Sequence, residues 1–430
     1  MARTRGLAGL AAGLCVLLCA CGDDVTIQIP TDRDLVEGEA GAEGSGGQTE
    51  AFLGSDTMPG QPSGSQGHGD QPDSQGYGNR PSGSPDQQDQ PSGSQDQMPP
   101  DRPREQDSSL QEPELRITIS AAGDMILGSY YGQGYAGSFP ETYKQEKDPG
   151  YFLENVYSIF SQDDLTLVNL EGPLTSAREG EGKEKTYCIK GEPEYASILT
   201  EGSVEAVSMG NNHRLDYYEK GSRDTVAAME EAGIVYAYDS NTGIYETQGI
   251  RIGLISVDIV SQGSGVEKYV QEGIASLQEE EVDLLIACCH WGIEGEHYPE
   301  AYQRSLGQKC IDWGADLVIG HHPHVLQGIE EYQGKYIVYS LGNFCFGANR
   351  NPVDKDTMIF QQTFVFVDGI RQEEAPVQVI PCSVSSLKER NDYRPTPAQG
   401  EEAERILQRI NTYSRELGAA FDTEGYLVRE

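Results

Sequence analysis

Short apolar runs rich in Val, Ile and Leu alternate with amphipathic stretches through about the last three quarters of the chain. Such runs are typical of buried strands, whereas a repeat of three to four residues is typical of helices. Their alternation predicts an α/β fold. Turn residues such as Gln333-Gly334 separate the late strands, so hairpins are also expected, which favours a layered sandwich over a doubly wound sheet. We expect strands at 116–122, 165–169, 204–209, 251–257, 282–289, 316–319, 336–340, 363–367 and 377–380, and helices at 219–232, 300–313 and 401–417.

Polar clusters follow five of these predicted strands. In open α/β sheets the carboxyl ends of the strands face one crevice, so residues far apart in sequence converge there. Six of the seven histidines lie between His213 and His324, five of them in or beside the clusters. The clusters are Gly123-Asp124, Asn169-Leu170-Glu171, Asn211-Asn212-His213, His290-Trp291-Gly292 and Gly320-His321-His322-Pro323-His324.

These clusters contain the donor types that a divalent metal site requires. Carboxylates neutralise the charge, and imidazole suits Zn, Mn or Fe. Two neighbouring ions would bind a phosphoryl group and activate water, with a histidine as proton donor. Simpler interpretations also exist: a turn at Gly123-Asp124, a capped helix start at Asn211-Asn212-His213 and a packed pair at His290-Trp291. His322 and His324 are alternate residues of a predicted extended loop, so their rings would point the same way.

Six segments in this region carry a recognisable series of motifs. They are Ala122–Met125, Val168–Pro173, Gly210–His213 with Asp216, His290–Gly292 with Glu294, Tyr298, Pro299 and Gln303, Gly314–His324, and Tyr339–Phe344. In type and order they resemble the motifs of the CapA capsule-synthesis (poly-γ-glutamate) family. That family is similar to calcineurin-like metallophosphoesterases. The resemblance therefore implies a four-layer α/β sandwich of two packed mixed sheets flanked by helices.

The resemblance also implies roles for individual residues. Asn212-His213 corresponds to the Asn-His pair of metallophosphoesterases, so we predict that His213, with Asp216, is catalytic. The expected Asp-x-His is Asp124-Met125-Ile126 here, and Asn169 and Glu171 stand in place of the usual bridging Asp. One divalent ion or an altered pair, of Mn, Zn or Fe, is therefore expected. The predicted metal ligands are Asp124, Glu171, Asn212, His290, His322 and His324, and the predicted substrate-binding residues are Asn169, His321 and Asn343.

A region of different composition precedes the predicted domain. Residues 38–113 are mostly Gly, Ser, Pro, Gln and Asp, with near-repeats at Gln61, Arg80 and Gln90. Such a segment buries too little apolar surface to offset the entropy of ordering. We expect residues 22–114 to be a disordered tether with a mean reach of about 50 to 60 Å, or a spacer of no selected length. Residues 115–430 then form the folded domain.

The first 21 residues predict export. Arg3 and Arg5 precede an apolar run at 7–18, which is too short to span a bilayer. Leu18-Cys19-Ala20-Cys21 resembles the bacterial lipobox, which implies that Cys21 is acylated and anchors the protein at the extracellular face of the cell membrane. An ordinary signal peptide without lipid is the alternative.

The chain is strongly acidic, with a formal net charge of −38. Residues 22–114 carry −15 and the first 21 carry +2, which leaves −25 on the predicted domain. Such a body repels nucleic acid, so nucleic-acid binding is not expected. An anionic ligand would need bound cations to screen this charge. The six cysteines of the domain have no CxxC zinc spacing, and those in apolar runs are predicted to be packed thiols.

Three functions are compatible with these features. The resemblance implies participation in making, exporting or retaining extracellular poly-γ-glutamate or a similar anionic polymer. The donor residues favour a metal-dependent phosphoesterase or another hydrolase at the cell wall, and a non-catalytic binding module is the third possibility. No GxxxxGK[ST] motif is present, so a synthetic role requires a partner ligase in the membrane.

Overall fold

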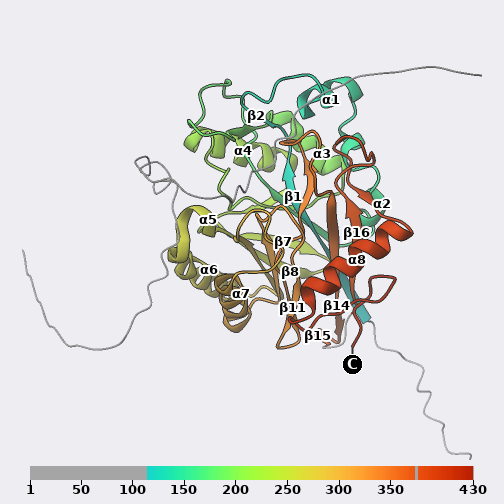
Figure 1. The fold of residues 1–430 in the computed structure, drawn as a ribbon. Helices are drawn as coiled ribbons and strands as arrows, with labels where there is room; N and C mark the ends of the chain where they lie inside the picture. The colour runs from blue at the N-terminus through green and yellow to red at the C-terminus, as the bar shows by residue number, and fades with distance from the viewer. Residues whose placement is uncertain (1–113, 373–375, 430) are drawn as a thin grey trace, which may run out of the picture.

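The computed structural model describes residues 114–372 and 376–429. Two mixed sheets pack face to face, and helices cover their outer faces (Figure 1). The predicted four-layer α/β sandwich is therefore confirmed. The predicted signal segment with Cys21, at 1–21, and the predicted tether, at 22–114, lie outside the described residues apart from Glu114.

The first sheet has nine strands, with the main order β17-β16-β14-β1-β3-β5-β6. Its central strand, β1 (Glu114–Ile126), pairs in parallel with β3 (Leu165–Leu170) and antiparallel with β14 (Asp356–Val367). The strand β3 in turn pairs in parallel with β5 (Ala206–Ser208), so β1, β3 and β5 end at the same edge. The remaining strands are β6 (Val235–Ala237), β13 (Asn343–Phe346), β15 (Ile370–Arg371), β16 (Val377–Ser383) and β17 (Thr396–Pro397).

The second sheet has six strands in the order β11-β12-β10-β9-β8-β7. Its four central strands are parallel to one another, and an antiparallel hairpin closes each edge. Gln333 and Gly334 form the β11–β12 turn with φ values of 53° and 73°, as a two-residue hairpin turn requires. The strands are β7 (Gly243–Thr247), β8 (Ile250–Asp258), β9 (Leu284–His290), β10 (Leu317–His321), β11 (Ile329–Tyr332) and β12 (Lys335–Val338), and a separate small sheet joins β2 (Ser129–Tyr130) to β4 (Ile189–Lys190).

The core forms because alternate strand residues face opposite sides of each sheet. In β9, Leu284 and Ile286 lie in the apolar layer between the two sheets, whereas Leu285 and Ala287 pack under the outer helices. A fully buried Leu or Ile contributes about 2 kcal/mol to stability. Since both faces of β9 are covered, its sequence is continuously apolar up to His290, the residue at which the strand reaches the site.

The helices form the two outer layers. Beside the first sheet lie α1 (Phe139–Glu146), η1 (Pro149–Phe152), α2 (Tyr157–Phe160), η2 (Pro193–Tyr195), α3 (Ala196–Glu201) and α4 (Tyr218–Ala232). Beside the second sheet lie α5 (Ile259–Gln262), η3 (Gly263–Val266), α6 (Glu267–Glu279) and α7 (Ala301–Trp313). The last helix, α8 (Glu401–Ser414), instead packs Ile406 and Ile410 into the apolar layer between the sheets.

Every predicted strand and helix is present, with shifted boundaries. The largest shift is in β14, which begins at Asp356 although a strand was predicted only from residue 363. Among the elements that were not predicted, β13 pairs in parallel with β1 beside the site. No helix within residues 114–372 and 376–429 has the length and apolar character needed to cross a membrane.

Candidate metal centre

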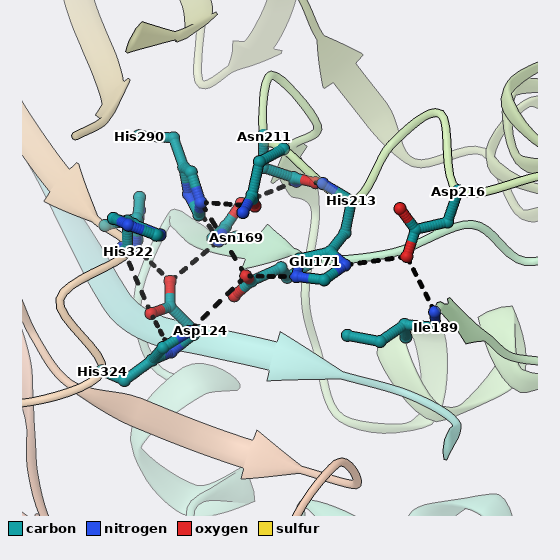
Figure 2. Close-up of polar contacts among 12 residues, drawn as sticks. Asp124, Asn169, Glu171, Ile189, Asn211, His213, Asp216, His290, His322 and His324 are labelled. Carbon is teal, nitrogen blue, oxygen red and sulfur yellow. Dashed lines mark hydrogen bonds and ion pairs between the residues drawn. The ribbon is translucent and has the colours of Figure 1, made fainter. Parts of the chain in front are cut away.

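The polar residues that follow the parallel strands meet at one place, where the two sheets present their carboxyl ends (Figure 2). The donors come from the ends of β1, β3, β9 and β10, and the segment after β5 lies beside them. We call five of these residues the donor cluster: Asp124, Glu171, His290, His322 and His324. The predicted convergence of Asp124, His290 and His324 is therefore observed.

Glycines before the polar residues allow strands and loops to approach closely. A side chain at Gly123 would place its Cβ 2.0 Å from the carbonyl oxygen of Gly342, and the next amide, that of Asp124, donates to that oxygen at 2.9 Å. A Cβ at Gly320 would lie 2.1 Å from the carbonyl oxygen of Tyr339. These positions accept only glycine, which explains the Gly-Asp and Gly-His pairs of the sequence.

Glu171 lies at the centre of three imidazole rings. Its Oε1 is 3.8 Å from Nε2 of His213, 3.8 Å from Nε2 of His290 and 3.7 Å from Nε2 of His324. These distances are too long for hydrogen bonds, and both carboxylate oxygens are buried without a hydrogen-bond partner among the described residues. Donors that share a tetrahedral zinc-sized ion lie about 3.3 to 3.6 Å apart. The spacing therefore suits a shared cation better than a direct contact.

Asp124 is held more tightly than Glu171. It accepts hydrogen bonds from Nδ2 of Asn169 at 2.8 Å and from the backbone amide of His322 at 3.3 Å. Nδ1 of His324 lies 3.1 Å from one oxygen, and Nδ1 of His321 lies 3.3 Å from the other. Burial alone would raise the pKa of Asp124, but its contacts with these two histidines lower the pKa well below its usual value. Asp124 is therefore a permanently charged donor.

The electrostatics of the donor cluster leave it short of positive charge. Burial raises the pKa of Glu171 well above its usual value. Burial also lowers the pKa of His322 to about 3, with a further contribution from His324, and lowers that of His290. Against the effect of burial, the carboxylates of Glu171 and Asp124 raise the pKa of His324 to about 10. A divalent cation would supply the charge that these carboxylates lack.

Three donor groups within the cluster and its rim could hold a cation, with ligand atoms within 4.8 Å of one another. They are Asp124, Glu171 and His324; Glu171, His290 and His322; and Glu294, His322 and His324. Glu171 belongs to two of these groups. It could therefore bridge two ions, which is the role of the Asp that is missing from the motif in this sequence. The position of the missing Asp-x-His histidine is Ile126, which packs against Ile189 and Phe346. Together with the unpartnered Glu171 oxygens, the donor set fits a divalent metal.

His213 and Asp216 form a pair at the edge of the donor cluster. Nδ1 of His213 lies 2.8 Å from Oδ2 of Asp216, which also accepts the backbone amide of Ile189 at 2.7 Å. Nζ of Lys185 is 2.6 Å from Oδ1 of Asp216. Burial lowers the pKa of His213, although Asp216 opposes this effect. Because Nδ1 faces a carboxylate, the arrangement leaves Nε2 of His213 directed toward Glu171 (Figure 2).

The remaining predicted site residues support this arrangement. Asn212 places Oδ1 3.1 Å from Nε2 of His290. The three predicted substrate-binding residues are all buried and contact other site residues. Asn169 binds Asp124, His321 lies beside it, and Asn343 places Oδ1 2.9 Å from Nδ1 of His324. Their contacts hold the donors in place, and their part in substrate binding stays a prediction.

The simpler interpretations of the motifs do not match the structure. Asp124 lies within β1 and not in a turn. The helix α4 begins at Tyr218 without a side-chain cap, so Asn211-Asn212-His213 is not a helix start. Trp291 packs under the helices while His290 faces the donors.

The expected extended loop at His322 and His324 is wrong. The two residues have φ values of 98° and 57°, the first of which is rare for any residue other than glycine. Their rings share a donor group because of this left-handed backbone and not because of strand-like alternation.

Three site residues were not assigned from the sequence. Asn211 donates to Oδ1 of Asn169 at 3.1 Å and to the carbonyl oxygen of Leu170 at 2.9 Å, so it fixes the segment that carries Glu171. Lys185 lies in a loop with no pattern of its own, and only its contact with Asp216 identifies it. Glu294 belongs to the His290 motif segment, which was the available signal.

The cysteines carry no sign of catalysis. All six described cysteines are free and buried, which confirms that those in the apolar runs are packed thiols. Burial raises the pKa of Cys288 to about 12, so its thiol is protonated at neutral pH.

Comparison with known families identifies the chain. The family described as "Bacterial capsule synthesis protein PGA_cap" matches residues 118–348, more than half of the chain. The chain belongs to this family. The donor cluster lies entirely within the region that the PGA_cap family covers.

Individual relatives agree with the PGA_cap assignment. The "PGA biosynthesis protein CapA" of Bacillus subtilis is 28% identical over 295 residues, which cover 63% of this chain and 77% of the relative. The "Capsule biosynthesis protein CapA" of Bacillus anthracis is 26% identical over 255 residues, which cover 54% and 60%. Among solved structures, a hypothetical protein from Thermus thermophilus is 16% identical with a TM-score of 0.36, over 62% of this chain and 99% of that chain.

Proposed function

We propose that this protein takes part in the synthesis, export or retention of extracellular poly-γ-glutamate or a similar anionic capsule polymer. The observation that carries the proposal is that the region matched by the PGA_cap family supplies every residue of the donor cluster. The names of the two Bacillus relatives, which refer to PGA and capsule biosynthesis, support the same process.

In this proposal the protein acts at the extracellular face of the cell membrane. The lipobox-like segment ending at Cys21 and the low-complexity segment after it support a lipid anchor followed by a tether. Because the sequence has no GxxxxGK[ST] motif, activation of glutamate would fall to a partner ligase in the same membrane. The anionic polymer is the second expected partner, and the acidity of the chain argues against nucleic acid.

A divalent metal would be held by the donor cluster, with Asn212 beside His290 as a further donor. When bound, such an ion polarises a phosphoryl or carbonyl oxygen and lowers the pKa of a bound water. The buried carboxylates of Asp124 and Glu171 would bind it and exclude competing anions. Mn, Zn or Fe is expected from the mixture of imidazole and carboxylate donors.

His213 and Asp216 would handle the proton. Nδ1–H of His213 would donate a hydrogen bond to Asp216. Nε2 would then accept a proton from the reacting group and return it to a leaving oxygen. Nζ of Lys185 lies 2.6 Å from Oδ1 of Asp216, so it balances the charge of this carboxylate and holds it against the His213 ring.

The experiment uses a strain that produces the polymer. We expect gene deletion to lower surface polymer at least tenfold, and the wild-type gene to restore it. His322→Ala should fail to restore the polymer. Glu296→Gln, which removes a negative charge outside the donor groups, should restore it. Cys21→Ser should release the protein into the medium. Unchanged surface polymer after deletion would contradict the proposal.

A second candidate function is metal-dependent hydrolysis of a phosphoester or of another wall component. The observation that favours it is the His213–Asp216 pair beside Glu171, because a positioned acid-base pair contributes about 10² to 10⁴-fold to catalysis. The mature full-length protein, supplied with Mn or Zn, should hydrolyse an aryl phosphate or phosphodiester, and His213→Ala should lose this rate. If neither substrate turns over, this function is wrong, and retained polymer binding by His213→Ala would indicate a binding module.

A further inference from the structure

The third donor group differs from the other two because it reaches solvent. Its carboxylate, Glu294, is exposed, whereas Asp124 and Glu171 are buried. Glu294 lies just after β9, and its carboxylate comes within 4.8 Å of ligand atoms of His322 and His324. The group therefore forms the outer rim of the donor cluster.

A buried nitrogen in this group lacks a partner. Nδ1 of His322 has no hydrogen bond within residues 114–372 and 376–429, although the residue is only 5% exposed. A buried polar atom without a partner opposes folding, so such atoms are rare unless a ligand satisfies them. The backbone of His322 is also strained, with φ of 98°. Strained backbone of this kind is typical of functional sites.

The loop that carries Glu294 is fixed to the histidine segment. The amide of Gly295 donates to the carbonyl oxygen of Pro323, between the two histidines, at 2.9 Å. Nε2 of Gln327 donates to the carbonyl oxygen of Glu296 at 2.8 Å. Farther along the loop, the ring of His297 stacks on Tyr413 of α8 at 5.0 Å between centroids. Glu294 is therefore held next to His322 and His324 by contacts of its loop that do not involve its own carboxylate.

We propose that Glu294, together with His322 and His324, holds an exchangeable divalent cation at the solvent face, through which a carboxylate or phosphate of an anionic substrate binds. The substrate part of this inference rests on the proposed function. The domain carries a net charge of about −25, so a polyanion needs a cation at the point of contact. A site with three protein donors leaves coordination positions open for water or substrate.

Sharing of ligands makes the outer cation exchangeable. His322 also belongs to the group with Glu171 and His290, and His324 to the group with Asp124 and Glu171. An ion at the rim therefore competes with the inner positions for its imidazoles. We expect it to bind more weakly than an ion bound by the buried carboxylates, and to exchange with solvent.

The first test measures Mn²⁺ binding to the full-length mature protein by electron paramagnetic resonance, without any substrate. Glu294→Gln should weaken the lower-affinity Mn²⁺ at least tenfold and leave the tighter Mn²⁺ within twofold, and Glu294→Asp should restore part of the affinity. Glu296→Gln, the same charge change two residues away, should bind like the wild type. A wild-type isotherm for Glu294→Gln, or equal weakening by Glu296→Gln, would overturn the proposal.

The second test measures the coupling between cation and anion. Inorganic phosphate and a γ-linked glutamate oligomer serve as probes in separate titrations, each with and without Mn²⁺. Mn²⁺ should tighten binding of at least one probe tenfold in the wild type and not in Glu294→Gln. If Mn²⁺ changes the affinity of neither probe in the wild type, the inference that an anionic substrate binds through this cation is overturned. If gene deletion leaves the surface polymer unchanged while the Mn²⁺ binding results are as expected, the proposed function is rejected and the cation site is retained.

Discussion

Two clusters of acidic side chains in this protein use their carboxylates in opposite ways. In the arginine–aspartate cluster, Asp354 and Asp356 face Arg405 and Arg409 of α8. Arg405 binds both oxygens of Asp356 at 2.6 Å, and Arg409 binds both oxygens of Asp354 at 2.7 and 3.0 Å. In the donor cluster, both oxygens of Glu171 lack a hydrogen-bond partner among the described residues. The aspartates of the first cluster have their partners within the protein, whereas Glu171 of the second requires a bound cation as its partner.

The pKa values of Asp354 and Glu171 differ in the same way. Burial would raise the pKa of Asp354, but the guanidinium of Arg409 lowers it below its usual value. Burial raises the pKa of Glu171 well above its usual value, because the neighbouring positive charge of His324 does not compensate for it. A paired carboxylate stabilises the fold, whereas an unpaired buried carboxylate opposes folding and is retained for binding.

The largest expected effect is loss of stability in the arginine–aspartate cluster. Asp356→Ala removes a buried carboxylate that pairs with the guanidinium groups of both Arg405 and Arg409. We expect a loss of about 3 kcal/mol in the free energy of unfolding, measured by urea denaturation. Asp354→Ala, at a more exposed position, should cost about 1 kcal/mol. Equal, small losses in both variants would show that this cluster is not a structural unit.

An effect of opposite sign is expected in the donor cluster. Glu171→Gln removes a buried carboxyl group that has no hydrogen-bond partner among the described residues, so the protein in excess chelator should unfold at the same or a higher urea concentration, with a gain of up to about 2 kcal/mol. The same variant should lose the extra stability that Mn²⁺ gives to the wild type. If Glu171→Gln destabilises the chelated protein as Asp356→Ala does, the contrast between the two clusters is wrong.

Asp163 gives the smallest effect and tests the comparison outside both clusters. Its Oδ1 has no partner among the described residues, its Oδ2 accepts a hydrogen bond from Thr166, and burial raises its pKa to about 7. A raised carboxyl pKa means that the folded protein binds the proton more tightly, so its contribution to stability is present at low pH. That contribution is lost as the pH rises from about 4 to 7.

Asp163→Asn should therefore stabilise the protein more at pH 8 than at pH 5. We expect a difference of about 1 kcal/mol after solvent screening of this partly exposed side chain. Thermal unfolding at both pH values, with Asp164→Asn as the neighbouring control, measures it. A difference of the opposite sign would mean that Asp163 is ionised and stabilised in the folded state.

Much of the fold could be predicted because both faces of the central strands are buried. The continuous apolar run of β9 and its end at His290 are visible in the sequence. The missed strand β13 is only four residues long, Asn343–Phe346, and its pairing with β1 depends on the close approach of Gly123 to Gly342. The first half of β14 was missed although it contains Met358, Ile359 and Phe360, because Gln361 and Gln362 interrupt the apolar pattern of the strand.

The site was predictable to the level of donor type but not of geometry. The histidines and carboxylates at strand ends identified the donor cluster, because the topology brings those ends together. Lys185 could not be found, since its position depends on a loop that folds back onto Asp216. The left-handed backbone of His322 could not be predicted from the sequence either, because this position is not a glycine or an asparagine, the residues that usually indicate it.

The central claim, that the donor cluster binds a divalent cation, is tested most directly by metal analysis of the purified full-length mature protein beside His322→Ala. After exposure to Mn²⁺ or Zn²⁺ and gel filtration, the wild type should retain at least one ion per chain, and His322→Ala should retain far less while giving the same circular dichroism spectrum. Equal metal content in the two proteins, or no retained metal in a folded wild type, would contradict the account.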